Sequence, residues 1–363
     1  MLIDIIAGAR PNFMKIAPIL HEIQARQKLG SNLEFRLVHT GQHYDKKMSG
    51  DFFDQLNIPL PDANLESGSG TQSEQTSKIM VRYESLLMQQ PSDLTLVVGD
   101  VTSTMACSIA AKKMNIKVAH VEAGIRSFDL TMPEEINRMV TDSITDYFFT
   151  TSRIANQNLL KQGISEDAIY FVGNTMIDTL VKNKNRFIQP TLWNELKLSE
   201  KEYIVMTLHR PANVDEENKL KSLIQEIIDH SNELPLIFPI HPRTAKIFKN
   251  LGIAQSRLHL VEPLSYLEFN YLVQYSKAVI TDSGGITEET TVMGVPCLTL
   301  RDNTERPETC EIGTNELIGT DPKAIKPAME LLFSGKWKKG SVPELWDGNT
   351  ASRIVKILEE IGE

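Results

Sequence analysis

Cysteine is scarce in this chain of 363 residues, which has only Cys107, Cys297 and Cys310. The three are scattered, odd in number and free of CxxC spacing, so they predict neither a disulfide framework nor a zinc site. We therefore expect a cytoplasmic protein without a structural metal. The sequence also lacks a long apolar run. Residues 2–8 are interrupted by Asp4 and are too few for a signal peptide or a membrane span, so we expect no membrane association.

Positive charge is also in short supply. Lys and Arg number 38 against 47 Asp and Glu, which gives a formal net charge of -9. This balance argues against broad binding to nucleic acid or to anionic membranes. The hydrophobic fraction of 41% and the charged fraction of 23% are those of a globular protein with a packed core. An anionic ligand would therefore have to be bound by a few local cations.

Two nucleotide-binding fingerprints are absent as well. No GxGxxG follows a predicted strand, and no GxxxxGK[ST] occurs anywhere in the sequence. The sequence therefore supports neither a dinucleotide site nor a P-loop, and we expect no nicotinamide cofactor.

Short apolar runs alternate with amphipathic helical patterns along the whole chain. The first series is LIDIIAG, EFRLVHTG, DLTLVVGD, KVAHVEAG and DYFFTT, and it ends near IYFVGNT at 169–175. After a polar stretch, a second series follows with YIVMTLHR, PLIFPIH, LHLVEP, AVITDSGG and PCLTLR. Runs with little polar alternation are typical of parallel strands covered by helices on both faces. Together with a length suited to two domains, they predict an α/β fold of two Rossmann-like domains facing a central cleft.

Ligands of such sheets bind beyond the carboxyl ends of the strands, so the residues after each run are the candidates for chemistry. The motif GARPNFMK at 8–15 follows the first run and places Arg10 and Lys15 near the start of a helix. Two cations beside the free N–H groups of a helix start suit an anion. The alternative is a solvated Arg and Lys on a surface loop.

A second candidate anion site lies in AVITDSGGITEET at 278–290. Ser283, Gly284 and Gly285 lead from a strand into a helix, and their small size would let a diphosphate approach the backbone N–H groups. The alternative is a plain turn in which Asp282 or Ser283 caps the helix, with Glu288 and Glu289 favouring its positive end. Glu288 is also a candidate acceptor for ribose hydroxyls.

Three carboxylates follow or precede elements at one predicted sheet edge. Asp100 ends VVGD, Glu122 lies in HVEAG, and Glu134 opens the helix of MPEEINR. Like charges at one site raise at least one pKa, which lets one acid stay protonated while another is ionised. Each also has a structural alternative. Asp100 could cap a helix that begins near Thr102, Glu122 could lie in a turn, and Glu134 could complete a capping box with Thr131 or pair with Arg138.

Two histidines also come just after predicted strands. His209 and Arg210 close TLHR, and His241 lies in IHPR. The other five histidines lack such a context, and we interpret them as packing or surface residues: His21, His39, His120, His230 and His259.

Ten motifs in this order resemble one family, the non-hydrolysing UDP-N-acetylglucosamine 2-epimerases. They are GARPNFMK, TGQH, GDVTST, HVEAGIRS, MPEEINR, GNTMIDTL, TLHR, HPR, DSGGITEE and TERPETCEIGT. The resemblance implies the fold of the B-type glycosyltransferases, with the last helix crossing back to the first domain. The expected domains are then 1–173 joined by 350–363, and 174–349. It also implies a cytoplasmic homodimer that supplies N-acetylmannosamine-type sugars for surface polysaccharide.

The resemblance further implies a reaction and the residues that perform it. Carbon 2 of the sugar has no neighbouring carbonyl, so UDP is first eliminated to give 2-acetamidoglucal, and its re-addition completes the inversion. The implied catalytic residues are Asp100, Glu122, Glu134 and His209. Arg138 would position Glu134, Glu288 would hold the ribose, and no metal or other cofactor is implied. The implied UDP-binding residues also include Arg10, Lys15, Arg210, His241, Ser283, Gly284, Gly285 and Arg301.

Two positions depart from the family pattern. Asn12 stands where Glu is commoner after Arg-Pro, which removes an acid near the phosphate cations and points to substrate choice. Gln42 and His43 are followed by Tyr44 and Asp45, which argues against activation by a second substrate molecule. The alternatives to this family's reaction are a hydrolysing epimerase, a glycosyltransferase and a UDP-sugar sensor. Acetamido-dideoxy and uronic-acid sugars are open as substrates.

Overall fold

The structure is a computed structural model that describes residues 1–41, 53, 55–240, 248 and 256–362. By its internal contacts the chain divides into two compact units, Met1–Lys182 with Glu344–Glu363, and Asn183–Pro343. Within these units helix α7 (Thr175–Asn183) lies with the first, apart from its last residue. The expected domains, with a boundary at 173/174, stay a prediction.

The first unit is built on a parallel sheet of seven strands in the order β3-β2-β1-β4-β5-β6-β7. Strand β4 is buried along its whole length, as expected for a strand covered on both faces. The strands are β1 (Leu2–Ala7), β2 (Glu34–His39), β3 (Ala63–Asn64), β4 (Leu94–Val98), β5 (Lys117–Val121), β6 (Tyr147–Thr150) and β7 (Ile169–Phe171).

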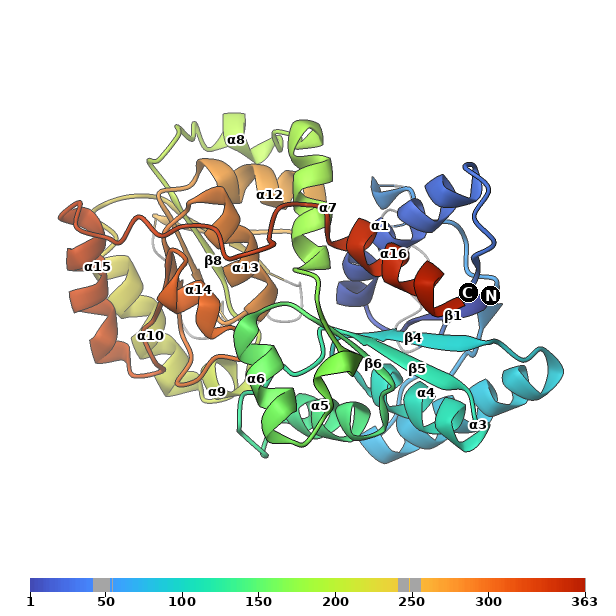
Figure 1. Cartoon of the computed structure of the whole chain (residues 1–363). Helices are drawn as coiled ribbons and strands as arrows, with labels where there is room; N and C mark the ends of the chain where they lie inside the picture. The colour runs from blue at the N-terminus through green and yellow to red at the C-terminus, as the bar shows by residue number, and fades with distance from the viewer. Residues whose placement is uncertain (42–52, 54, 241–247, 249–255, 363) are drawn as a thin grey trace. The chain divides into compact units, whose positions relative to one another are not determined.

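Helices cover both faces of this sheet. Figure 1 shows α3, α4 and α5 on one side and α1 and α16 on the other, as right-handed crossovers on either side of β1 require. Its helices, besides α7, are α1 (Arg10–Gln27), α3 (Gln72–Gln89), α4 (Thr102–Lys113), α5 (Pro133–Ile144), α6 (Arg153–Lys161), η1 (Glu166–Ala168) and α16 (Thr350–Gly362).

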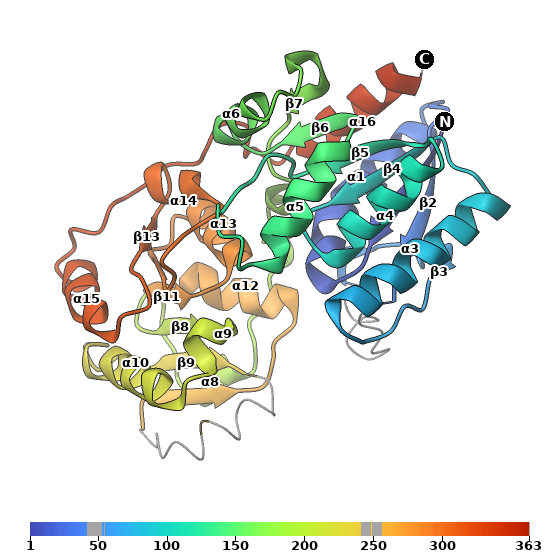
Figure 2. The same cartoon turned by 90° about the horizontal axis from the view of Figure 1, so that it is seen from below.

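The second unit has a parallel sheet of six strands in the order β10-β9-β8-β11-β12-β13. Its strands are β8 (Ile204–Thr207), β9 (Leu236–Pro239), β10 (Leu258–Val261), β11 (Ala278–Thr281), β12 (Cys297–Thr299) and β13 (Asn315–Leu317). Its helices are η2 (Lys184–Arg186), α8 (Leu192–Glu195), α9 (Pro211–Val214), α10 (Glu217–Asp229), α12 (Tyr266–Tyr275), α13 (Gly284–Met293), α14 (Pro307–Glu311), η3 (Pro322–Ala324) and α15 (Ile325–Phe333). Figure 2 shows the same elements from below.

Alternate residues of β8, together with Tyr203 just before it, belong to two different apolar cores in this unit. Ile204 and Met206 pack with α10 and α15, while Tyr203 and Val205 pack with residues of α12. Because successive side chains of a strand point to opposite faces, this division places one core on each side of the sheet. The predicted α/β class with two parallel sheets is therefore confirmed.

The C-terminal helix returns to the first unit, as the family resemblance implied. Helix α16 contacts α1, and Arg26 pairs with Glu359 at 2.8 Å. Asp178 of α7 accepts the first N–H groups of α16, from Thr350 at 3.1 Å and Ala351 at 2.7 Å. A carboxylate from another helix therefore satisfies the free donors at the start of α16.

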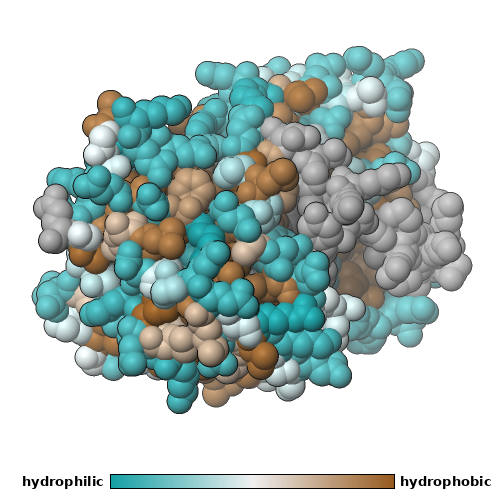
Figure 3. Space-filling view, turned by 90° about the vertical axis from the view of Figure 1, so that its right-hand side faces the viewer, coloured by the Kyte–Doolittle hydropathy of each residue, from teal (hydrophilic) through white to brown (hydrophobic). Residues whose placement is uncertain are grey.

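The surface seen from the right-hand side of Figure 1 is mostly hydrophilic, with hydrophobic residues scattered over it (Figure 3). Isolated exposed apolar side chains are normal for a globular protein. None of the helices in the described part of the chain has the length and apolar character needed to cross a bilayer.

Candidate functional site

Lys15 and the buried Glu122 form an ion pair at the carboxyl edge of the first sheet. Glu122 follows β5 directly, and its left-handed backbone, with φ of 71°, turns the chain out of the strand. Lys15 Nζ from α1 lies 2.8 Å from Glu122 Oε2. A Cβ atom at Gly99 would lie only 2.9 Å from Lys15 Nζ. Gly99, with φ of 66°, therefore leaves the room that this pair occupies.

Asn12 ties the start of α1 to the end of β4. Its Oδ1 accepts from the backbone N–H groups of Gly8 at 3.0 Å and Ala9 at 2.9 Å, and its Nδ2 donates to Val98 O at 3.1 Å. An ionised glutamate could accept the first two bonds but has no hydrogen to donate to Val98. At this position, where the sequence departs from the family pattern, Asn12 therefore makes a bond to Val98 O that an ionised glutamate could not make.

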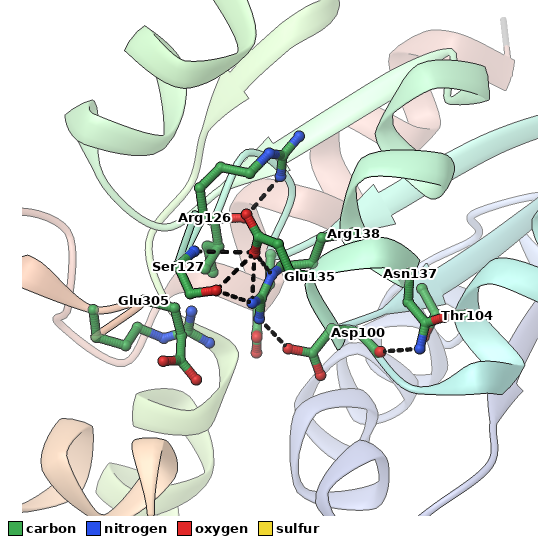
Figure 4. A network of polar contacts seen from close by, with 12 residues as sticks. Asp100, Thr104, Arg126, Ser127, Glu135, Asn137, Arg138 and Glu305 are labelled. Atoms are coloured by element: carbon green, nitrogen blue, oxygen red, sulfur yellow. Dashed lines mark hydrogen bonds and ion pairs between the residues drawn. The ribbon is translucent and has the colours of Figure 1, made fainter. Parts of the chain in front are cut away.

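Arg138 of α5 contacts two carboxylates, those of Asp100 and Glu135 (Figure 4). Its NH1 lies 2.6 Å from Asp100 Oδ2, and its Nε donates to Glu135 Oε2 at 2.9 Å. Glu135 also accepts from the backbone N–H groups of Ser127 and Phe128, each at 3.0 Å. Burial alone would raise the pKa of Glu135, but these backbone bonds and Arg138 hold it below its ordinary value. The ionised carboxylate of Glu135 therefore holds the guanidinium of Arg138 in place, and this guanidinium in turn positions Asp100.

Two expectations about Glu134 are wrong in this structure. Helix α5 begins at Pro133 with Met132 as its N-cap, so no capping box forms with Thr131. Glu134 is exposed, whereas Glu135 is buried and pairs with Arg138 at i,i+3. Arg138 therefore contacts Asp100 and Glu135 rather than positioning Glu134. The register of α5 decides this, because positions 135 and 138 lie on its buried face.

The alternative reading of Asp100 as a helix cap is also wrong. Val101 is the N-cap of α4 and makes no side-chain cap bond. The side chain of Asp100 instead turns to Arg138, and its backbone carbonyl accepts from Asn137 Nδ2 at 2.8 Å. Asp100 is 26% exposed, so a ligand can reach it.

A buried polar chain supports the turn that carries Asp100. His120 lies 2.8 Å from Gly99 O through Nε2 and 2.7 Å from Asp142 Oδ1 through Nδ1. Asp142 also pairs with Arg126 at 2.6 Å. Burial would raise the pKa of Asp142, but His120 and Arg126 lower it. His120 is fully buried, so of the two interpretations, packing or surface, the structure shows packing for this histidine.

In the second unit, His209 follows β8 and lies against Asp282, which follows β11. His209 Nδ1 is 2.7 Å from Asp282 Oδ1, and the backbone N–H groups of His209 and Arg210 donate to the same carboxylate at 3.0 Å and 2.9 Å. The His209 side chain is 62% exposed, whereas Asp282 is fully buried. The buried carboxylate of Asp282 therefore holds the imidazole of His209, which is exposed to solvent.

Two arginines and a helix start meet around one carboxylate in the same unit. Arg301, after β12, pairs with Glu305 Oε2 at 2.6 Å, and Arg210 NH2 lies 3.6 Å from Glu305 Oε1. A Cβ atom at Gly284 would lie 3.4 Å from Glu305 Oε1, which places the carboxylate beside the first residue of α13. Strands β8, β11 and β12 are neighbours, so their carboxyl ends bring these groups together. Two residues predicted to bind an anion, Arg210 and Arg301, therefore lie close to the start of α13, with the carboxylate of Glu305 between them.

The structural alternatives for the 278–290 turn are not observed. Ser283 is the N-cap of α13 but makes no side-chain cap bond, and Asp282 turns to His209. Glu288 and Glu289 lie beyond the first turn and are buried. Neither Asp282 nor Ser283 therefore caps α13 with its side chain, and the backbone N–H of Ser283 donates to Thr281 Oγ1 at 3.0 Å.

The two acids of α13 have different partners. Arg306 Nε donates to Glu288, and the two side chains form an ion pair. The hydroxyl of Tyr266 donates to Glu289 at 2.9 Å. Burial raises the pKa of Glu289 to about 7, and the neighbouring Glu288 adds to this effect. Burial likewise raises the pKa of Glu308 to about 7, although Arg306 opposes it.

Some predicted residues lie outside this description. His241, Gln42, His43, Tyr44 and Asp45 are not among the described residues. For Arg10 the structure describes the backbone at the start of α1 but not the side chain. Over the described ranges, no three or more His, Cys, Asp or Glu side chains are grouped so as to hold a metal ion.

Comparison with known proteins decides the family. The sequence model of the UDP-N-acetylglucosamine 2-epimerase family matches residues 25–359. A UDP-N-acetylglucosamine 2-epimerase of Methanocaldococcus jannaschii is 40% identical over 372 residues, with 99% of each chain covered. This chain belongs to the UDP-N-acetylglucosamine 2-epimerase family. It is therefore an isomerase, as predicted.

Other members of the UDP-N-acetylglucosamine 2-epimerase family show the range around this chain. A crystal structure of the M. jannaschii enzyme with UDP-GlcNAc and UDP has a TM-score of 0.89 at 38% identity, covering 99% of this chain and 100% of that one. A Pseudomonas aeruginosa UDP-2,3-diacetamido-2,3-dideoxy-D-glucuronate 2-epimerase is 36% identical, covering 99% of this chain and 100% of its own. The family therefore includes epimerases named for more than one UDP-sugar.

The sequence interpretation missed several residues that contact the candidate site residues of this epimerase. Glu135 had a signal in the doubled Glu of PEEINR, three residues before Arg138. Asp282 was considered only as a helix cap. Glu305 and Arg306 lie in the quoted motif TERPETCEIGT, but their partners Arg301 and Glu288 are set by the packing of loops, which spacing alone does not reveal.

Proposed function

We propose that this protein is a non-hydrolysing epimerase that interconverts UDP-N-acetylglucosamine, or a closely related UDP-2-acetamido sugar, and its manno epimer at carbon 2. The observation that carries the proposal is the pair of carboxylates at adjacent strand ends. Asp100 follows β4 and Glu122 follows β5, and each is held by a cation of its own, Arg138 or Lys15. Positioned carboxylates are the groups that proton transfer at carbon 2 needs.

The proposed reaction has two balanced halves. Breaking the bond from carbon 1 to the UDP oxygen leaves cationic character on the sugar, and a carboxylate takes the proton from carbon 2, which gives 2-acetamidoglucal and UDP. Return of a proton to the opposite face and re-addition of UDP at carbon 1 give the epimer. Asp100, Glu122, Glu134 and His209 are the proposed proton-transfer residues. Glu134 and His209 are exposed in this structure.

The proposed binding site for the departing diphosphate uses cations and backbone N–H groups. Negative charge grows on the UDP oxygen as the bond breaks, so preorganised donors lower the barrier. Arg210, Arg301 and the start of α13 provide such donors in the second unit. Arg10, Lys15 and His241 complete the proposed set, and Glu288 is the proposed ribose acceptor. The bound UDP-GlcNAc and UDP of the M. jannaschii relative support a UDP-sugar as ligand.

We also propose that the enzyme works in the cytoplasm as a homodimer, as the family resemblance implies. The three cysteines are free in this structure, which fits a reducing compartment. Light scattering on the purified protein would give the mass directly. A mass of one chain across the micromolar range would contradict the dimer.

One experiment tests the reaction class. The enzyme is incubated with UDP-N-acetylglucosamine in deuterium oxide, and the proton spectrum is followed. We expect loss of the carbon 2 proton signal while the sugar stays attached to UDP, and the appearance of the manno epimer. Free N-acetylmannosamine with UDP would indicate a hydrolysing enzyme. If the carbon 2 protons were unchanged, epimerisation of this substrate would be contradicted. The remaining alternatives would then be a glycosyltransferase and a UDP-sugar sensor.

A further inference from the structure

Asp282 is a fully buried carboxylate on which several donors converge. The backbone N–H groups of His209 and Arg210 and the side-chain amide of Asn213, at 3.1 Å, all donate to it. A carboxylate that accepts from this many donors is stabilised in its ionised form. The pKa of Asp282 agrees with this: burial raises it, but the bonds from His209, Arg210 and Asn213 bring it below its ordinary value.

The ionised state of Asp282 fixes the proton on the neighbouring imidazole. An ionised carboxylate can only accept hydrogen bonds, so a ring nitrogen 2.7 Å from it must carry a hydrogen. That nitrogen is Nδ1 of His209. In the neutral ring the other nitrogen, Nε2, is then an acceptor, and it belongs to a side chain that is 62% exposed.

We propose that Asp282 is the positioning residue of His209. It holds the proton on Nδ1, fixes the ring plane, and leaves Nε2 as the nitrogen that takes up and returns a proton during the reaction. When Nε2 gains a proton, the imidazolium is balanced by the carboxylate, and Asp282 itself is never protonated. This inference rests on the proposed function, because it assigns a proton-transfer atom to His209.

The geometry separates this role from a purely structural one. Asp282 also holds the loop after β8 through two backbone N–H groups, and Asn213 links the same carboxylate to Leu300 O at 3.0 Å. Removing Asn213 would take away one of the donors to Asp282 and loosen this loop, but it would leave in place the contact between the imidazole and the carboxylate. Replacing Asp282 by Asn would preserve the side-chain shape but offer an amide that can donate to Nδ1 and so permit the opposite tautomer.

The test combines nitrogen NMR with kinetics. In protein carrying ¹⁵N-labelled histidine, His209 is assigned by loss of its signals in His209→Gln. We expect the neutral ring of the wild type to show a protonated Nδ1 and an unprotonated Nε2. In Asp282→Asn we expect that pattern to be lost and kcat for carbon 2 exchange to fall on the order of 10²- to 10⁴-fold. Asn213→Ala should lower the thermal midpoint, yet keep the wild-type tautomer and kcat within a few-fold.

Three results would overturn the proposal. They are an Nε2–H tautomer in the wild-type protein, an unchanged tautomer in folded Asp282→Asn, or a loss of kcat in Asn213→Ala as large as in Asp282→Asn. The wild-type spectrum decides even if Asp282→Asn does not fold. Exchange of the carbon 2 proton at the wild-type rate in His209→Gln would also refute the role of Nε2, whatever its tautomer. Failure of the proposed function looks different, because the wild-type enzyme would then leave the carbon 2 proton unexchanged.

Discussion

Individual side chains at the first sheet edge give the most direct prediction. Asp100 and Glu122 are each held by one cation, so Asp100→Asn and Glu122→Gln keep the shape of the site but remove a group that exchanges protons. We expect either change to lower turnover roughly a hundredfold or more. Carbon 2 exchange in deuterium oxide measures this.

A matched control separates chemistry from charge. Glu84 is an exposed carboxylate on α3, and Glu84→Gln removes the same charge far from any catalytic candidate in sequence. We expect its turnover to equal that of the wild type. Near wild-type rates in both Asp100→Asn and Glu122→Gln would refute the assignment of these carboxylates.

The sequence was sufficient to predict that Asp100, Glu122 and His209 come just after strands, because each follows a recognisable apolar run. It was not sufficient to choose between Glu134 and Glu135 as the partner of Arg138. That choice depends on the residue at which α5 begins and on which face packs inward, and helix ends are the least certain feature of a sequence pattern. Likewise, the fine position of Glu305 depends on how the loop after β12 folds back toward Arg301 and Arg210.

Among the secondary-structure elements, the start of α13 leads to a prediction about ligand charge. Glu305 places a carboxylate where the proposed diphosphate binds, beside Arg301 and Gly284. Glu305→Gln removes this competing negative charge while keeping a similar shape. We expect UDP to bind roughly three- to tenfold more tightly, whereas the affinity for uncharged uridine stays within about twofold.

Calorimetric titration of both ligands checks this. Asp302→Asn is the control, since Asp302 is exposed on the same loop and bonds to Thr320 instead. Weaker UDP binding in Glu305→Gln would show that the carboxylate serves to hold Arg301 in place.

The buried acid Glu289 of α13 gives a prediction about stability and pH. Its pKa is about 7 in the folded protein, above its ordinary value of 4.5, with Tyr266, Asn270 and Glu288 as the polar groups that influence it. Between these values the folded state holds a proton that the unfolded state has released. The contribution of Glu289 to stability therefore falls as pH rises from 4.5 to 7 and is constant above that.

Glu289→Gln removes this penalty and keeps an acceptor for Tyr266. We expect the variant to be more stable than the wild type by roughly 2 to 3 kcal/mol at pH 8, and equal to it at pH 4.5. Thermal unfolding without ligand at several pH values measures the difference. Glu330→Gln, on the exposed side of α15, should show no such trend. A stability difference that is independent of pH would contradict the prediction.

Most of the elements could be predicted because their strands are apolar and buried on both faces. Two strands that no predicted run covers, β3 and β13, have only two and three residues and include Asn64 and Asn315. Each lies at one edge of its sheet, and its pairing with β2 or β12 defines it rather than any hydrophobic run.

For the chain as a whole, Asp178 of α7 links the returning C-terminal segment to the first unit. This residue accepts the two N–H groups at the start of α16. We expect Asp178→Ala to destabilise the protein by about 1 to 2 kcal/mol and to speed hydrogen exchange in α16 more than elsewhere. Asp178→Asn keeps one acceptor and should cost less. Equal exchange in α16 for the wild type and Asp178→Ala would show that its contacts with α1 suffice.

The returning helix also brings the two chain ends together. A Cβ atom at Gly362 would lie 3.3 Å from Met1 Cε, and both figures of the fold draw the ends near each other. The chain passes between its units twice, after Lys182 and after Pro343. A circular permutant opened after Lys182, with a short linker joining the old ends, would make each unit one uninterrupted stretch of polypeptide with a single connection between them. Such a rearranged chain would allow either half to be expressed by simple truncation.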